Sequence, residues 1–191
     1  MTLHGQAEAS NWVQRWSHLA PPGARVLDVA CGDGRHMKWF AALGFQVTGV
    51  DRSEEALALA GQYGITIQAD MEQGAWPIHT PSGPVPFDVV VVTNYLWRPL
   101  FPTLLQSLAP GGLLLYETFA CGNASVGKPS RPDFLLQPGE LLARCESLQI
   151  IAFEDGFLDQ PERFVQRIAA IKPIAASDTN RAPKRYLLSL K

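Results

Sequence analysis

The chain has 191 residues, of which 47% are hydrophobic and 18% charged, and its formal net charge is −2. This length and composition are typical of one globular domain with a sizeable core, and they exclude an intrinsically disordered chain. The small net charge argues against a general nucleic-acid-binding surface. The longest apolar runs are too short to cross a bilayer and no secretory signal is visible, so we expect a cytoplasmic protein without a membrane segment.

Short apolar runs rich in Val, Leu and Ile predict strands, and segments with helical spacing of apolar residues lie between them. In chain order, we expect a helix at 9–19, a strand at 25–30, a helix at 34–43, a strand at 46–50, a helix at 54–62, strands at 65–69 and 87–92, a helix at 101–108, a strand at 112–117, a helix at 138–147 and strands at 148–153 and 164–171. Ser53 is a favourable N-cap for its helix, and Pro138 is tolerated at a first helical position.

The alternation of strands and helices predicts an α/β fold with a doubly wound sheet. Its first five strands are almost continuously apolar, which is typical of parallel strands buried on both faces. The last two strands are joined by a segment without a helix signal, which predicts an antiparallel hairpin. We expect a single domain over 1–191, with a helix and cover at 1–22, a loop over the site at 119–137 and an extension at 173–191.

Cysteines and histidines show no pattern of a disulfide framework or a metal site. Cys31, Cys121 and Cys145 are scattered, and none belongs to a CxxC pair. The four histidines lack metal-ligand spacing. We therefore expect no bound metal.

The first strand ends in the glycine-rich turn DVACGDGRH, for which three ligands compete. A P-loop would need GxxxxGK followed by Ser or Thr, which is absent. A dinucleotide fingerprint would need a third glycine where Met37 stands, and its pyrophosphate would meet Asp33 and Asp28. S-adenosylmethionine carries an ammonium and a sulfonium, so Asp28 could meet the ammonium while Gly32 and Gly34 allow close approach of the backbone.

Polar residues also follow the next two strands. Asp51, followed by Arg52, stands where an acid can bond ribose hydroxyls. Asp70 could accept a hydrogen bond from an adenine amino group, and Met71 could offer its backbone N–H and an apolar edge to the same ring.

With these motifs in order, residues 24–119 resemble a class I S-adenosylmethionine-dependent methyltransferase. LDVACGDGRH resembles the first motif of that family, with Ala30 where its first glycine often stands. VTGVD, QADM and LAPGGLLLYETF resemble the later motifs, and the GDGR version in a short chain is similar to the tellurite-resistance-type, small-molecule branch. The resemblance implies a Rossmann-like, seven-stranded, mostly parallel sheet with an antiparallel last strand.

The expected cofactor is S-adenosyl-L-methionine, with S-adenosyl-L-homocysteine as its product. We place His36 at the start of a helix, near the cofactor carboxylate. The expected cofactor-binding residues are Asp28, Ala30, Gly32, Gly34, His36, Asp51, Arg52, Asp70, Met71 and Asn94.

The fourth strand runs into TNYLWRPLF, which the resemblance places beside the transferable methyl group. Asn94 and Tyr95 are therefore catalytic candidates, and the ring of Tyr95 or Trp97 could attract the sulfonium. Glu117 is the candidate general base, although an in-line displacement depends more on alignment than on a base. The expected acceptor-binding residues are Tyr95, Arg98, Asn123, Lys128, Arg131 and Phe134.

The leading hypothesis is a methyltransferase acting on a small molecule, as a monomer or weak homodimer. The second is an RNA methyltransferase that uses Lys128, Arg131 and the basic residues between Lys172 and Lys191, although nucleic acid is an unlikely partner at this net charge. The third is a nicotinamide-binding oxidoreductase or a non-catalytic nucleotide-binding module.

Overall fold

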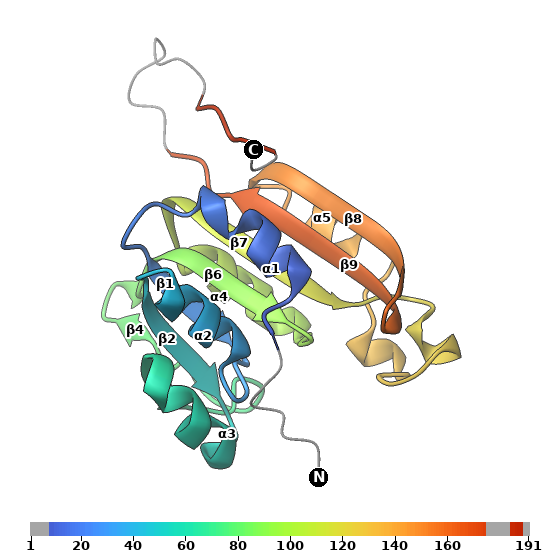
Figure 1. Cartoon of the computed structure of the whole chain (residues 1–191), viewed down its shortest axis with the longest axis horizontal. Coiled ribbons are helices and arrows are strands. Elements are labelled where there is room, and N and C mark those ends of the chain that lie inside the picture. The colour runs from blue at the N-terminus through green and yellow to red at the C-terminus, as the bar shows by residue number, and fades with distance from the viewer. Residues whose placement is uncertain (1–7, 175–183, 189–191) are drawn as a thin grey trace.

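A computed structural model describes residues 8–174 and 184–188 of the chain (Figure 1). Its centre is a seven-stranded sheet in the order β3-β2-β1-β6-β7-β9-β8. The strands are β1 Arg25–Val29, β2 Gln46–Asp51, β3 Ile65–Gln68, β6 Phe87–Thr93, β7 Leu108–Phe119, β8 Gln149–Asp159 and β9 Glu162–Ile171. Neighbouring strands are parallel from β3 to β7, and β9 is antiparallel to both β7 and β8. The predicted Rossmann-like sheet with an antiparallel last strand, and its hairpin, are confirmed.

Helices cover both faces of this sheet (Figure 1). They are α1 Asn11–Trp16, α2 Arg35–Ala42, α3 Glu54–Ala60, α4 Phe101–Gln106 and α5 Glu140–Arg144. Trp12, Phe40 and Leu57 bring α1, α2 and α3 into one apolar cluster. Phe101 and Leu141 bring α4 and α5 into a second cluster on the other face. The sheet is therefore the middle layer of three, as its apolar strands predict.

Several boundaries differ from the prediction for local reasons. The last helix begins at Glu140 and not at Pro138, because Gly139 caps it with a left-handed φ of 70°. β7 begins at Leu108 and includes the APGG segment, which lies in a register shift between the β6 pairs Phe87–Leu108 and Val89–Leu113. The segment 76–86, for which no helix or strand was expected, contains the small hairpin of β4 His79–Thr80 and β5 Gly83–Pro84.

The N-terminal helix is fastened to the sheet. Ser10 caps α1 by accepting a hydrogen bond from the Val13 N–H, and the Trp12 indole N–H donates to the Ile168 carbonyl at 3.1 Å. A 3-10 turn, Ser17–Leu19, completes the helix expected at 9–19. His18 on this turn contacts the Leu187 carbonyl at 2.9 Å, which brings the part of the C-terminal extension that is described beside α1.

In residues 8–174 and 184–188, none of the helices is long and apolar enough to span a bilayer.

Candidate functional site

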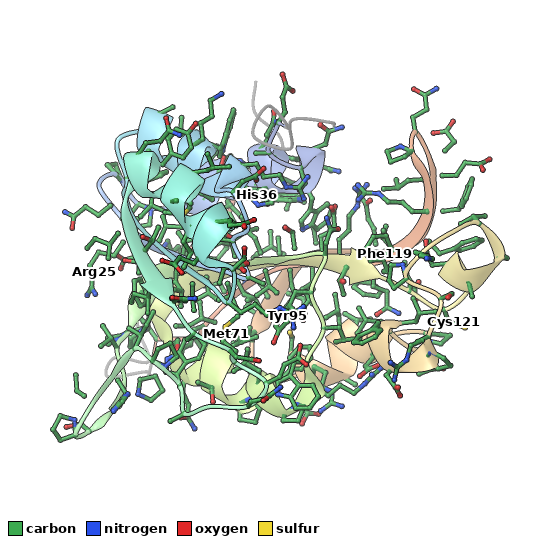
Figure 2. All side chains as sticks on the ribbon, turned by 90° about the horizontal axis from the view of Figure 1, so that it is seen from below. Arg25, His36, Met71, Tyr95, Phe119 and Cys121 are labelled. Carbon is green, nitrogen blue, oxygen red and sulfur yellow. The ribbon has the colours of Figure 1, made fainter. Side chains whose placement is uncertain are left out.

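The carboxyl ends of β1, β2, β3 and β6 meet at one edge of the sheet and form a pocket of about 210 Å³. In doubly wound sheets this edge is where ligands bind. Met71 and Tyr95, labelled together in Figure 2, form part of its wall. The lining residues are Ala30, Asp51, Arg52, Ala69, Asp70, Met71, Glu72 and Tyr95. The structure thus gathers five of the predicted cofactor residues from three strand ends.

The turn after β1 is built from left-handed backbone positions. Ala30, Gly32 and Gly34 have φ values of 56°, 54° and 87°. A Cβ added at Gly34 would lie 2.9 Å from the Ala60 Cβ, so this glycine allows α3 to approach the turn. A Cβ at Gly32 would meet nothing within 4 Å, so Gly32 leaves open space beside the backbone. Of the two glycines, only Gly32 has the room that a ligand would use.

Asp51 holds this turn against the second strand. Its Oδ2 accepts a hydrogen bond from the Gly32 N–H and its Oδ1 accepts one from the Ser53 N–H, both at 2.9 Å. A carboxylate oxygen can accept more than one hydrogen bond. Asp51 can therefore keep both contacts and still bond the hydroxyls of a ribose in the pocket.

Asp70 and Met71 form the turn after β3. The Asp70 Oδ1 accepts a hydrogen bond from the Glu72 N–H at 2.9 Å, which is ordinary turn chemistry and still leaves Oδ2 for a ligand. Met71 is buried and packs in the core cluster on the α4 side. It gives the pocket an apolar wall suited to a flat ring.

Asp28 lies at the end of β1 with its side chain buried, and neither carboxyl oxygen has a hydrogen-bond partner among the described residues. Burial raises the pKa of Asp28 to about 8, the nearby Asp51 charge adds to the rise, and Arg35 opposes it. An unpaired buried carboxyl group is costly, and an ammonium would satisfy it. Asp28 therefore fits the amino group of an amino-acid ligand.

His36 lies away from both Met71 and Tyr95, on the α2 side of the sheet (Figure 2). It is buried, and its Nε2 accepts a hydrogen bond from the Ser10 N–H at 3.3 Å. Its Nδ1 therefore carries the proton and faces the Thr93 hydroxyl at 3.4 Å. Burial, together with the Arg35 charge, lowers the pKa of His36 to about 3. The structure places His36 as a link between the N-terminal segment and the sheet and not in the pocket wall.

A second pocket of about 290 Å³ adjoins the first, because Glu72 and Tyr95 line both. It contains three predicted residues, namely Asn94, Tyr95 and Phe134, and its lining is Glu72, Asn94, Tyr95, Leu96, Thr118, Phe119, Pro129 and Phe134. The Tyr95 hydroxyl is buried without a partner among the described residues. Burial raises the pKa of Tyr95, and the Glu72 and Asp70 charges add to the rise, so the phenol keeps its proton and has a donor to offer.

The predicted cations of the acceptor site lie outside this lining. Arg98 donates to Glu140 at 2.8 and 2.9 Å and to the Asp133 and Leu135 carbonyls at 2.7 and 2.9 Å. The hydrogen bond to Glu140 raises the pKa of Arg98. Its side chain therefore fastens the loop at 119–137, called the cover loop below, to α5.

Three further predicted acceptor residues have other surroundings. Arg131 is exposed and pairs with Asp133 at 3.0 Å, and Lys128 is exposed. Asn123 is buried, donates to the Pro129 carbonyl at 3.0 Å and accepts from the Phe164 N–H at 3.1 Å. Asn123 thus shapes the cover loop from within.

Glu117, the predicted base, is buried beside two arginines of β9. Its carboxylate lies 3.5 Å from Arg163 and 3.4 Å from Arg167. Its carboxylate is directed to these arginines, and Glu117 is not among the residues that line the second pocket. The structure does not bring Glu117 to that pocket.

Five lining residues of the second pocket were not predicted: Glu72, Leu96, Thr118, Phe119 and Pro129. Glu72 had a local signal, because it directly follows the adenine-type motif QADM. The inward direction of Thr118 and Phe119 depends on how β7 ends and had no such signal.

A family model described as a methyltransferase domain matches residues 1–131. Curated relatives include the ubiquinone biosynthesis O-methyltransferases of Burkholderia thailandensis and of an Azoarcus species. Each is 31% identical over 115 residues, which is 56% of this chain and 49% or 48% of the relative. The chain spans about half the length of the curated relatives it matches.

Solved structures share the fold. TehB from Haemophilus influenzae superposes with a TM-score of 0.68 at 20% identity over 87% of this chain and 63% of its own. A SAM-dependent methyltransferase from Methanosarcina mazei gives 0.66 at 16% identity over 88% of this chain and 100% of its own. The family model and the sheet order agree with the class I S-adenosylmethionine-dependent type that the first motif implies, and so do the residues at the strand ends. The chain belongs to the methyltransferase-domain family.

Proposed function

We propose that this protein transfers the methyl group of S-adenosylmethionine to a small molecule by in-line displacement. The observation that carries the proposal is the pair of adjoining pockets at the carboxyl edge, which share Glu72 and Tyr95. One pocket has the acids and apolar wall that an adenosine needs. The other offers room for an acceptor next to it.

The residues of the first pocket fit the cofactor part by part. Asp51 would bond the ribose, and Asp70 with Met71 would hold the adenine. Asp28, which is buried and lies outside the lining of that pocket, would receive the ammonium, because its two oxygens have no partner among the described residues. The bound cofactor would supply an electrophilic methyl group on its sulfonium.

The acceptor would lie against Asn94 and Tyr95, with Leu96, Phe119 and Phe134 as apolar walls. Such walls exclude water and align the nucleophile with the methyl group, which supplies most of the acceleration in a displacement of this kind. A lone pair of the acceptor forms the new bond to carbon, and the carbon–sulfur pair stays on sulfur.

Glu72 would take the proton released by a hydroxyl or amine acceptor. Among the described residues that line the second pocket, it is the one with a charged side chain. Tyr95 would donate to the acceptor, because its pKa is raised. Glu72 therefore replaces Glu117 as our candidate for the proton acceptor.

The alternatives have less support. An RNA acceptor would need a basic surface, and although Lys128 and Arg131 are exposed, Arg181 and Lys191 lie outside the described residues. A nicotinamide dinucleotide would place its pyrophosphate beside Asp33, whose negative charge disfavours it. A cytoplasmic location and a monomeric or weakly dimeric state remain proposals.

Calorimetric titration with S-adenosylhomocysteine tests the cofactor site. We expect Asp51→Ala to weaken binding by about 10-fold or more, since two ribose hydrogen bonds to a charged group are lost and the turn loses its tie. The control Glu55→Ala changes an exposed acid nearby in α3 and should bind as the wild type does. If the wild-type protein does not bind S-adenosylhomocysteine, the proposed function is wrong.

A further inference from the structure

The second pocket is bounded mainly by aromatic rings and compact apolar side chains. Tyr95 and Phe119, both labelled in Figure 2, come from the turn after β6 and from the end of β7, and Phe134 comes from the cover loop. Leu96 and Pro129 complete the apolar part of the lining. Three rings around a cavity of about 290 Å³ favour a ligand with a flat apolar body.

Glu72 gives this pocket its charge. Its side chain is exposed, so the carboxylate lies where the pocket opens to water. Asp51 and Asp70 line the adjoining first pocket, in which Arg52 is the cation of the described lining. The two linings thus carry three acids and one base, and the electrostatic potential at their shared wall is negative.

The cations of the cover loop do not offset this charge. The Arg131 guanidinium lies 5.2 Å from the centre of the Phe134 ring, but Arg131 is outside the lining and pairs with Asp133 at 3.0 Å. Lys128 is exposed and also outside the lining. A carboxylate on a ligand would therefore meet Glu72 and, within the lining that the structure describes, no compensating cation.

Tyr95 is held firmly at this wall. The preceding Asn94 has a left-handed φ of 54°, and its N–H donates to the Glu117 carbonyl at 2.9 Å. The Tyr116 hydroxyl donates to the Tyr95 carbonyl, also at 2.9 Å. Burial raises the pKa of Tyr95 and the Glu72 charge adds to the rise, so the phenol and that carboxylate are close to each other.

The hydroxyl of Tyr95 is buried and lacks a hydrogen-bond partner in the part of the chain that the structure describes. A buried polar group without a partner is costly, so a ligand that bonds it gains affinity. Its oxygen can accept from an N–H while its own proton stays available as a donor. The wall shared by the two pockets therefore suits a ligand group rich in N–H donors.

We propose that the methyl acceptor is an aromatic amine, with its nitrogen between Glu72 and the Tyr95 hydroxyl and its ring beside Phe119. This substrate class rests on the proposed function, because it identifies the acceptor of that reaction. The ammonium form is attracted by the Glu72 charge and can donate to both groups. A hydroxyl compound has no charge for Glu72 to attract, and a carboxylate is repelled.

The same arrangement accounts for every proton of the transfer. An ammonium acceptor first passes one proton to the Glu72 carboxylate, which frees the nitrogen lone pair. That lone pair forms the new bond to the methyl carbon, while the carbon–sulfur pair stays on sulfur. Glu72 then releases its proton to water and is again an anion, beside an N-methylammonium product.

The test is an NMR titration of the S-adenosylhomocysteine-loaded protein with three probes of similar shape. At neutral pH benzylamine is a cation, benzyl alcohol is neutral and benzoate is an anion. We expect benzylamine to bind most tightly and benzoate least tightly. Because Glu72 is exposed, its effect is moderate and screened by salt, so added salt should reduce the difference between benzylamine and benzyl alcohol.

Glu72→Gln removes the charge and keeps the size of the side chain. It should weaken benzylamine by about 3- to 10-fold and leave benzyl alcohol unchanged. Tyr95→Phe keeps the ring and removes the hydroxyl, and it should weaken benzylamine by a similar factor. Glu55→Gln, at an exposed acid of α3 outside both linings, is the matched control and should bind all three probes as the wild type does.

The amine is the wrong class if benzyl alcohol or benzoate binds as tightly as benzylamine, or if the preference for benzylamine persists in Glu72→Gln. The cofactor would still bind in those cases, so the proposed function would stand. Failure of the wild type to bind S-adenosylhomocysteine would instead count against the proposed function. The same three probes, titrated into the unloaded protein, would then still decide whether the pocket prefers an amine.

Discussion

Asp28 and His36 face each other across 3.9 Å in the buried edge of the sheet. The pKa of Asp28 is raised from 3.8 to about 8, and that of His36 is lowered from 6.5 to about 3. Both shifts have burial as their largest cause, and both favour the uncharged form. Near neutral pH the pair is therefore a neutral acid beside a neutral imidazole.

These shifts set opposite dependences of stability on pH. From pH 3.8 to about 8 the folded protein keeps the Asp28 proton that the unfolded chain has released, so the free energy of unfolding falls as the pH rises. From about pH 3 to 6.5 the unfolded chain protonates His36 and the folded protein does not, so the free energy of unfolding rises with pH. Above pH 6.5 only the Asp28 effect remains.

We expect Asp28→Asn to remove that remaining slope, because asparagine does not titrate. Urea denaturation between pH 6.5 and 8 should show the wild type losing up to about 1.4 kcal/mol per pH unit relative to the variant, which is the value for one proton. Glu55→Gln, at an exposed acid, should keep the wild-type slope. Equal slopes for Asp28→Asn and the wild type would show that Asp28 is already ionised in the folded protein.

The first motif lacks the third glycine that would let its helix pack closely on a strand, and Gly49 of β2 explains why the helix packs closely nevertheless. Met37 stands at that position, on the face of α2 that packs against β2. A Cβ on Gly49 of β2 would collide with the Met37 Sδ. The glycine that permits close packing of helix and strand is therefore on the strand.

At the scale of elements, Arg98 joins the turn after β6, the cover loop and α5. Its four donated hydrogen bonds end on Asp133 and Leu135 of the loop and on Glu140 at the start of α5. The side chain is about one-third exposed, so these bonds are partly sheltered from water. The loop that lines the second pocket through Pro129 and Phe134 thus depends on a residue outside that pocket.

We expect Arg98→Met to destabilise the protein by about 2 kcal/mol, because two carbonyls and a carboxylate lose their donor. Limited proteolysis should then cut within 119–137 sooner, while S-adenosylhomocysteine binds as in the wild type. Arg144→Met is the matched control, since Arg144 also pairs with Glu140, but at 3.4 Å and on a more exposed side chain. Equal protection of the loop in both variants would exclude Arg98 as its clamp.

At the scale of the whole molecule, the two pockets are lined by elements that are far apart in sequence. The first pocket draws on the ends of four strands, and the second adds the cover loop. A ligand that binds only the native state raises the melting temperature, and the stabilisation grows with the logarithm of its concentration divided by its dissociation constant. Thermal unfolding therefore reports on the intact arrangement.

Thermal unfolding with three ligands should separate the function classes. At 100 times its dissociation constant, S-adenosylhomocysteine should stabilise the native state by about 2.7 kcal/mol, which raises the melting temperature by roughly 5–10 °C in a domain of this size. NAD and NADP at the same concentration should leave it unchanged. A rise with a nicotinamide dinucleotide and none with S-adenosylhomocysteine would favour the oxidoreductase.

The sequence by itself determined the sheet, its order of connection and the class of cofactor. Apolar strand runs and the short link between the last two strands are local patterns, and residues that follow parallel strands must share one edge. Ala30, Asp51, Arg52, Asp70 and Met71 met in one pocket for that reason.

Only the tertiary structure decided which charged side chains face a ligand. Arg98, Lys128 and Arg131 are near the site in sequence, but side-chain direction depends on the path of the cover loop, and their best partners lie elsewhere or in solvent. Arg163 reaches Glu117 because β9 returns antiparallel beside β7. Pairing across 46 residues or more is a property of register and packing, which no local pattern specifies.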